Sequence, residues 1–148
     1  MNFFRLTFPP ISVDIGLLLL RVGLGSSMLV LHGWGKLMRL VEGNLAFSDP
    51  IGLGPVPSLA LAVFAEFLCS LLLIVGWSTH IAALAGAVTM AVAFSSAHGM
   101  RLTGEGNGEL AFIYLIGYVG LFFAGGGRFS LDGQANSRRA SKLKPAKK

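Results

Sequence analysis

The sequence predicts an all-α integral membrane protein, a bundle of four membrane-spanning helices with both termini in the cytoplasm. Of its 148 residues, 53% are hydrophobic and only 13% are charged, whereas a soluble domain carries about 25% charged residues. The mean hydropathy of +0.70 agrees with this class. Four apolar segments approach the length of about 20 residues that a helix needs to cross a bilayer. The residue alternation typical of a membrane β-barrel is absent.

The predicted spans are separated by short or glycine-rich connections. Because a bilayer offers the backbone no water, each apolar segment must be helical. We expect the spans over residues 14–37, 58–77, 80–97 and 109–124. The connection 38–57 contains three prolines and the connection 98–108 is polar and glycine-rich. Both therefore predict loops, and four spans place these loops on the same side of the membrane.

Lysine and arginine are distributed unevenly between the two sides. Residues 128–148 contain seven basic residues against one acidic residue, so the rest of the chain is nearly neutral. Together with Arg5, eight basic residues lie on the side of the termini and three on the side of the loops. Because cytoplasmic segments are enriched in these residues, both termini are predicted to be cytoplasmic. We divide the chain into an N-terminal cytoplasmic segment (1–13), a membrane domain (14–133) and a basic, disordered cytoplasmic tail (134–148).

Several functional classes are excluded by what the sequence lacks. Cys69 is the single cysteine, so the chain forms no internal disulfide, CxxC redox pair or thiolate zinc cluster. The basic residues lie in an alanine- and serine-rich tail and not among aromatic residues of a folded surface, which excludes nucleic acid as a partner. No haem, flavin, iron–sulfur or dinucleotide motif is present. We expect no cofactor held by the chain alone and the lipid bilayer as its main surroundings.

Two charged side chains, Arg21 and Glu66, lie within the predicted spans. An ionisable group in a bilayer costs several kcal/mol unless it is paired. Counted from the cytoplasmic end of each span at about 1.5 Å rise per residue, Arg21 lies about 10 Å into the first span and Glu66 about 16 Å into the second. An arginine side chain bridges the difference of about 6 Å. We therefore predict a buried Arg21–Glu66 ion pair, which either fixes the register of two helices or has a functional role.

A second group of polar residues lies near the predicted outer mouth of the bundle. His32 and Lys36 are four residues apart and share a helical face. His98 ends the third span, and Glu109 opens the fourth after Glu105 and Asn107. Two histidines and a carboxylate bind a metal ion or relay protons, unless each side chain simply extends to water. The candidate polar cluster comprises Arg21, His32, Lys36, Glu66, His98 and Glu109.

Three stretches of the chain resemble the DoxX family of membrane proteins. Residues 17–37 (LLLLRVGLGSSMLVLHGWGKL) are similar to its first helix, with an arginine and an HGxxKL ending. Residues 65–84 (AEFLCSLLLIVGWSTHIAAL) are similar to its glutamate-bearing helix. Residues 108–132 (GELAFIYLIGYVGLFFAGGGRFSLD) resemble its closing signature, with Gly126 where that turn often has proline.

The resemblance covers about residues 15–133. It implies a four-helix, multi-pass protein of a bacterial inner membrane that acts as an oxidoreductase subunit. Relatives include the small subunit of a thiosulfate:quinone oxidoreductase. The family positions that match are Arg21, His32, Lys36, Glu66 and Glu109.

Three functions are open at this point, and the residues do not decide whether the chain is an enzyme. In the first, the chain is an accessory subunit of a membrane redox system, and its outer polar cluster binds a small anion or a quinone while a partner subunit supplies the electrons. In the second, it is a non-enzymatic scaffold or a small-solute-binding protein, with another protein or a second copy of itself as partner. In the third, His32, His98 and Glu109 bind a metal ion. We predict no metal, because histidines are common near helix ends.

Overall fold

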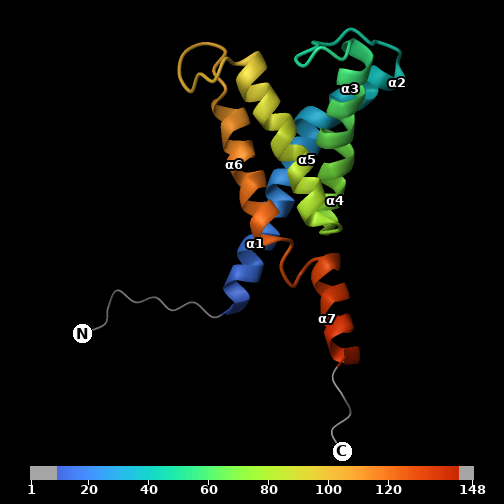
Figure 1. Cartoon of the computed structure of the whole chain (residues 1–148), viewed down its shortest axis with the longest axis vertical. Helices are drawn as coiled ribbons and strands as arrows, with labels where there is room; N and C mark the ends of the chain where they lie inside the picture. Colours follow the sequence, from blue (N-terminus) through green and yellow to red (C-terminus); the bar gives the residue numbers. More distant parts are fainter. Residues whose placement is uncertain (1–9, 144–148) are drawn as a thin grey trace, which may run out of the picture.

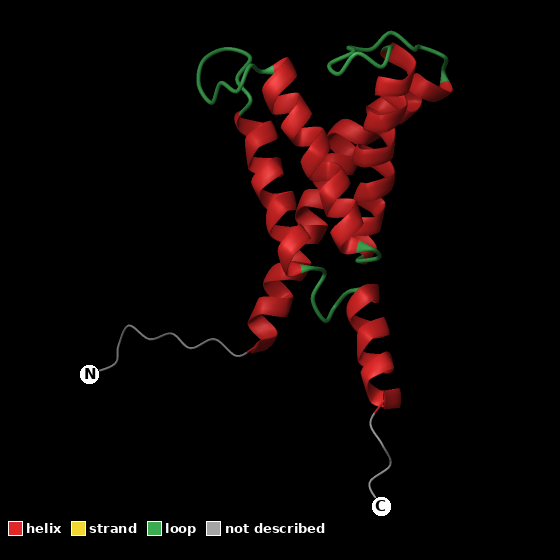
Figure 2. Cartoon of the chain, in the orientation of Figure 1, coloured by secondary structure: helices red, strands yellow, loops and turns green. Residues whose placement is uncertain are grey.

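The computed structural model describes residues 10–143, and every regular element in that range is a helix (Figure 2). The first two spans consist of α1 (Pro10–Met28), η1 (Leu29–Gly33), α2 (Trp34–Val41), α3 (Pro55–Val63), η2 (Phe64–Leu68) and α4 (Cys69–Val75). The remaining elements are α5 (Thr79–Val92), η3 (Ala93–Ala97), α6 (Glu109–Ala124) and α7 (Leu131–Leu143). The predicted all-α class is confirmed.

Three continuous helical segments are long and apolar enough to cross a membrane, namely Ile11–Val41, Pro55–Val75 and Thr79–Ala97. The fourth apolar helix, α6, has 16 residues, which gives about 24 Å at 1.5 Å per residue against a hydrocarbon core of about 30 Å. The first span is longer than predicted at both ends, since its helices begin at Pro10 and end at Val41. Four residues of the predicted N-terminal segment are therefore helical, and residues 1–9 lie outside the described range.

The helices form two arms that diverge towards one end of the bundle (Figure 1). One arm consists of α5 and α6, which pack along each other, while α2 and α3 lie in the other arm. α1 packs against α4. We call the end with loops 42–54 and 98–108 the loop side, and the end with the α4–α5 turn and α7 the termini side. The largest buried apolar cluster joins the arms and includes Met28, Cys69, Leu73, Ala82, Ala83, Tyr118 and Leu121.

Each of the three long spans contains a five-residue π turn: η1, η2 and η3. In η1 the Trp34 N–H bonds to the Leu29 carbonyl, and in η2 the Cys69 N–H bonds to the Phe64 carbonyl. Such turns are frequent at functional sites. η1 and η2 contact each other directly, and a Cβ atom on Gly33 would overlap the backbone of Glu66. Glycine at position 33 thus allows the first two spans to cross in close contact.

Residues 134–143 correct one prediction, because we expected a disordered tail from residue 134 and the structure forms α7 from Leu131 to Leu143. The Ser130 hydroxyl accepts a hydrogen bond from the Gly133 N–H at 3.0 Å, as an N-cap residue does. Asp132 lies in the first turn and Lys142 in the last, which matches the helix dipole. Residues 144–148 lie outside the described range.

Asp132 joins α7 to the start of α5. Its carboxylate accepts hydrogen bonds from the backbone N–H groups of Ser78 at 2.9 Å and Thr79 at 2.8 Å. These are unpaired donors at the N-terminus of α5, where Ser78 has a φ of 51°. Partial burial raises the pKa of Asp132, but the hydrogen bonds from Thr79 and Ser78 outweigh it, so the pKa lies below its ordinary value.

Replacing Asp132 with asparagine is expected to lower the free energy of unfolding by about 1 kcal/mol at pH 7, because the amide keeps one acceptor oxygen and the other backbone N–H loses its charged partner. A carboxylate whose pKa is lowered by folding stabilises the protein fully above its unfolded pKa, near 3.8, and loses that effect as the pH falls through the lower folded value. Thermal unfolding in nanodiscs between pH 3 and 7 measures this. The gap between wild type and Asp132→Asn should close below about pH 3.8, and a gap of the same size at pH 3 would contradict the assignment.

Candidate functional site

Glu66 lies at the π turn of the second span and forms an ion pair with Lys36 of α2. The Lys36 ammonium donates a hydrogen bond to Glu66 Oε2. The Glu66 side chain is only 7% exposed, while that of Lys36 is 23% exposed. The close contact between Gly33 and the Glu66 backbone brings the two spans together at this level. The ion pair therefore satisfies a carboxylate that would otherwise be buried without a partner.

The predicted Arg21–Glu66 ion pair is wrong. Arg21 donates hydrogen bonds to three backbone carbonyls, those of Leu73 at 3.0 Å, of Ile74 and of Phe129. Leu73 follows Glu66 by seven residues, so Arg21 lies about 10 Å closer to the termini side than Glu66. The depth estimate failed because the first span is longer than assumed and crosses the bundle obliquely (Figure 1).

Arg21 instead closes the termini side of the bundle. Its side chain is 2% exposed and binds two carbonyls of the last turn of α4, of which that of Leu73 also accepts the Gly76 N–H at 3.1 Å. Gly76, with a φ of 72°, ends α4, and a Cβ there would collide with Ser130 and approach the Arg21 guanidinium at 3.0 Å. Arg21 thus joins α1, the end of α4 and the segment before α7, which is a structural role.

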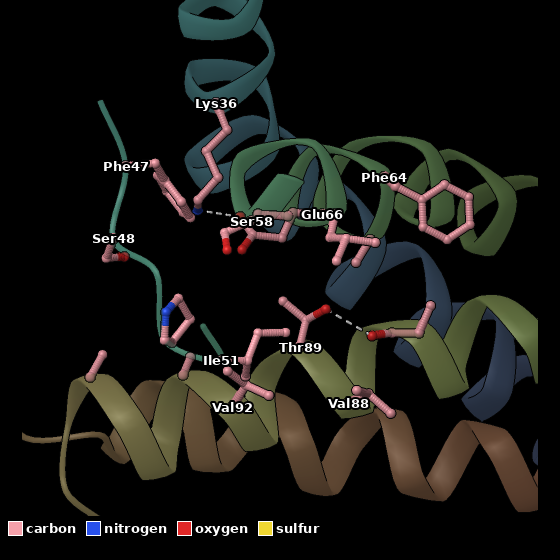
Figure 3. A pocket seen from close by; sticks show the side chains of 17 residues that line it. Lys36, Phe47, Ser48, Ile51, Ser58, Phe64, Glu66, Val88, Thr89 and Val92 are labelled. Atoms are coloured by element: carbon pink, nitrogen blue, oxygen red, sulfur yellow. Dashed lines mark hydrogen bonds and ion pairs between the residues drawn. The ribbon is translucent and has the colours of Figure 1, made fainter. Parts of the chain in front are cut away.

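A cavity of about 460 Å³ lies beside the Lys36–Glu66 pair (Figure 3). This volume is within the range of small-molecule sites, about 300–1,000 Å³. The walls are formed by Lys36 of α2, by Phe47, Ser48, Pro50 and Ile51 of the loop, by Ser58, Leu61, Ala62, Phe64, Ala65 and Glu66 of α3 and η2, and by Ala85, Val88, Thr89, Val92, Ala93 and Ala97 of α5 and η3. Lys36 and Glu66 are the members of the candidate polar cluster that line it.

The cavity has one polar corner within largely apolar walls. Figure 3 shows Lys36, Glu66 and Ser58 together on one wall, with Thr89 on the wall opposite. The Thr89 hydroxyl donates to the Ala85 carbonyl at 3.0 Å, which leaves its oxygen able to accept a hydrogen bond. The arrangement suits a mostly apolar ligand with one polar end.

The other members of the candidate polar cluster lie away from this cavity. The His32 ring packs edge-on against Tyr114, with ring centres 6.1 Å apart, and the Tyr114 hydroxyl donates to Ser27 at 2.8 Å. His98 Nδ1 lies 2.9 Å from the Gly106 carbonyl within the second loop. Glu109 is exposed at the start of α6. Among residues 10–143, no three His, Cys, Asp or Glu side chains are placed to hold a metal ion, so the metal site considered for His32, His98 and Glu109 is not formed.

The sequence alone did not reveal Phe47, Ser58 and Thr89 as wall residues. Ser58 and Thr89 are ordinary small residues of transmembrane helices. The sequence does contain one signal for the loop residues, the aspartate of the proline-rich loop. In the structure, Asp49 accepts hydrogen bonds from the Leu53 and Gly54 N–H groups at 2.9 and 2.8 Å. The bond from Gly54 is the main cause that lowers the pKa of Asp49. An aspartate before a glycine- and proline-rich helix start indicates an ordered loop.

Comparison with known proteins gives two matches. The model of the DoxX family matches residues 16–99, a range that includes the Lys36–Glu66 pair and every residue that lines the cavity. An uncharacterized protein of Haemophilus influenzae is 33% identical over 117 residues, which cover 71% of this chain and 80% of that protein. No solved structure matches the chain.

Proposed function

This chain belongs to the DoxX family of membrane proteins, and we propose that it is an accessory subunit of a membrane redox system that binds a quinone in the Lys36–Glu66 cavity. The observation that carries the proposal is the buried ion pair at the polar corner of an apolar cavity. A quinone has an apolar body and carbonyl oxygens, to which the Lys36 ammonium donates hydrogen bonds.

Reduction of a quinone to a quinol takes two electrons and two protons. In this proposal the partner subunit supplies the two electrons, and water on the loop side supplies the two protons. The Lys36 ammonium donates a proton to the reduced headgroup, and the Glu66 carboxylate, which carries no proton in the ion pair, relays protons from water to the Lys36 amine and the headgroup. A small anion is the less suitable ligand. Glu66 already neutralises Lys36, and a second negative charge beside a buried carboxylate is repelled.

A scaffold function is the second candidate, supported by α7. This helix carries Arg138, Arg139 and Lys142 on an exposed surface and extends away from the bundle on the termini side (Figure 1). A basic, exposed helix suits an acidic partner surface. In this candidate the cavity has no ligand, and the helix alone carries the function.

Quinone binding is expected to depend on the ion pair. Detergent-solubilised wild type should bind a tritiated short-chain benzoquinone saturably in a scintillation proximity assay, and Lys36→Met should weaken binding at least tenfold, because the carbonyl loses its charged donor. Arg101→Gln, which changes a cation of the second loop that does not line the cavity, serves as the matched control. The scaffold function would be favoured by two results together. The wild type would bind no quinone saturably, and a chain truncated after residue 130 would no longer bind its partner protein.

The orientation proposed for the chain places both termini in the cytoplasm of a bacterial cell and both loops outside its inner membrane. It is supported by the excess of lysine and arginine on the termini side. In a Cys69→Ser background, Ser48→Cys should react with an impermeant maleimide in intact cells stripped of their outer membrane. Ser137→Cys should react only after the inner membrane is opened, and the reverse pattern would invert the topology.

A further inference from the structure

The cavity beside the Lys36–Glu66 pair also borders the outer surface of the bundle. Leu61, Phe64 and Val88 line it, and each is about half exposed, at 50%, 46% and 57%. Figure 3 shows Phe64 and Val88 on opposite walls, at the end away from Phe47. Apolar side chains exposed on a membrane-spanning helix contact lipid. The cavity therefore opens on the lipid-facing surface, between η2 and α5.

This opening results from the divergence of α3 and α5. α5 packs against α4 and against η2, whereas its contact with α3 is at most marginal. In Figure 1 the two arms diverge towards the loop side. Alanines line the walls where longer side chains would fill the space, at positions 62, 65 and 85. The gap between the arms is thus kept open by small residues on both sides.

On the loop side, the chain covers the cavity. Phe47, Ser48, Pro50 and Ile51 of the loop line it, and Figure 3 shows Phe47 and Ser48 at the end opposite Phe64. Two sets of contacts hold this segment in place. At its end, the Asp49 carboxylate accepts hydrogen bonds from the Leu53 and Gly54 N–H groups and, at 3.0 Å, from the Ser58 hydroxyl.

Arg39 holds the beginning of the same segment. It donates a hydrogen bond to the Ala46 carbonyl, and its guanidinium carbon lies 6.0 Å from the centre of the Phe47 ring, the distance of a cation–π contact. Because the loop is held at both ends over the ion pair, the route from water is obstructed while the route from lipid is open.

We infer that the ligand reaches the cavity from the bilayer, through the opening between η2 and α5, and that it is a membrane-dissolved molecule with an uncharged, hydrogen-bonding head and an apolar tail. The head lies beside Lys36 and Glu66, and the tail leaves between Phe64 and Val88 into the lipid. An uncharged head fits because the two side chains neutralise each other, so a charged head would remain unpaired. Only the choice of a quinone rests on the proposed function.

The route is tested without any ligand by a nitroxide spin label on Thr89→Cys in the Cys69→Ser background, in nanodiscs. Labels on Ile81→Cys of the lipid-facing surface and on Ser48→Cys of the loop are the two references. We expect oxygen, which dissolves in lipid, to relax the label at position 89 as strongly as the label at 81. A water-soluble nickel chelate should relax it several-fold less than the label at 48. Relaxation by the chelate as strong as at position 48 would overturn the inference.

The route is tested with a ligand by narrowing the opening. Val88→Trp should slow association of a quinone with an isoprenoid tail at least tenfold, whereas Ile81→Trp, on the lipid-facing surface of the same helix but outside the cavity, should leave it unchanged. If Ile51→Trp slows association of the quinone and Val88→Trp leaves the association rate unchanged, the route lies on the loop side and the inference is overturned. A wild type that binds no quinone would refute the proposed function, while the spin-label result would still decide the route.

Discussion

Arg21→Met is expected to lower the free energy of unfolding by at least about 2 kcal/mol, because it removes a donor from three backbone carbonyls. The Leu73 carbonyl keeps a hydrogen bond from the Gly76 N–H at 3.1 Å, whereas a buried carbonyl left without any donor costs about 1–3 kcal/mol. Two of these carbonyls end α4 and the third belongs to Phe129, before α7. The variant should therefore loosen the termini side first. The Lys36–Glu66 pair lies too far from Arg21 to be affected directly.

The single cysteine provides the measurement. Cys69 is 1% exposed, so a maleimide dye that fluoresces on reaction reports unfolding during a thermal ramp. Arg21→Lys keeps the charge but not the planar group of five donors, and we expect it to recover part of the loss. Leu20→Ala, at a neighbouring and more exposed position of α1, is the control. If Arg21→Met unfolds at the same temperature as the control, Arg21 does not join the helices as described.

The Lys36–Glu66 pair is expected to respond unequally to the loss of each partner. Lys36→Met leaves a carboxylate that is only 7% exposed, and breaking a buried pair costs about 3–5 kcal/mol. Glu66→Met leaves an ammonium that is 23% exposed on a long, flexible side chain, which can extend towards water on the loop side. Lys36→Met should therefore be the more destabilising single variant.

The double variant separates the energy of the ion pair from the cost of burying one unpaired charge. Replacing a buried ion pair by apolar residues of similar volume is often neutral, so Lys36→Met/Glu66→Met should be more stable than Lys36→Met alone. The coupling energy from this cycle should be at least about 1 kcal/mol. Additive effects in the maleimide unfolding assay would mean that the two side chains do not interact. The double variant should also lose quinone binding despite its recovered stability.

The membrane fold could be predicted because each span must by itself present an apolar surface to lipid and pair its own backbone N–H and carbonyl groups. Both requirements can be read from one segment of sequence at a time. The spans at Pro55–Val75, Thr79–Ala97 and Glu109–Ala124 lie within three residues of their predicted bounds. α7 was missed because its composition is polar. Its formation depends on the Ser130 cap and on Asp132 bound to α5, and both are contacts of the folded chain.

The site was predicted only in its members Lys36 and Glu66. Depth along a helix follows from residue counting, but which side chains meet depends on tilt and crossing, and these are set by packing. Counting assumed an upright first span and therefore placed Arg21 beside Glu66. The oblique span places Lys36 there instead, and leaves His32, His98 and Glu109 at separate positions on the loop-side half of the bundle.

The contact at Gly33 has a mechanical consequence for the first span. On one side of it, Arg21 fixes α1 to the ends of α4 and the segment before α7. On the other side, α2 has no buried residue and carries Lys36 one turn beyond the crossing. The first span is therefore fixed by buried side chains on the termini side of Gly33, whereas beyond Gly33 it is held by the packing of α2 against α3 and by the Lys36–Glu66 pair.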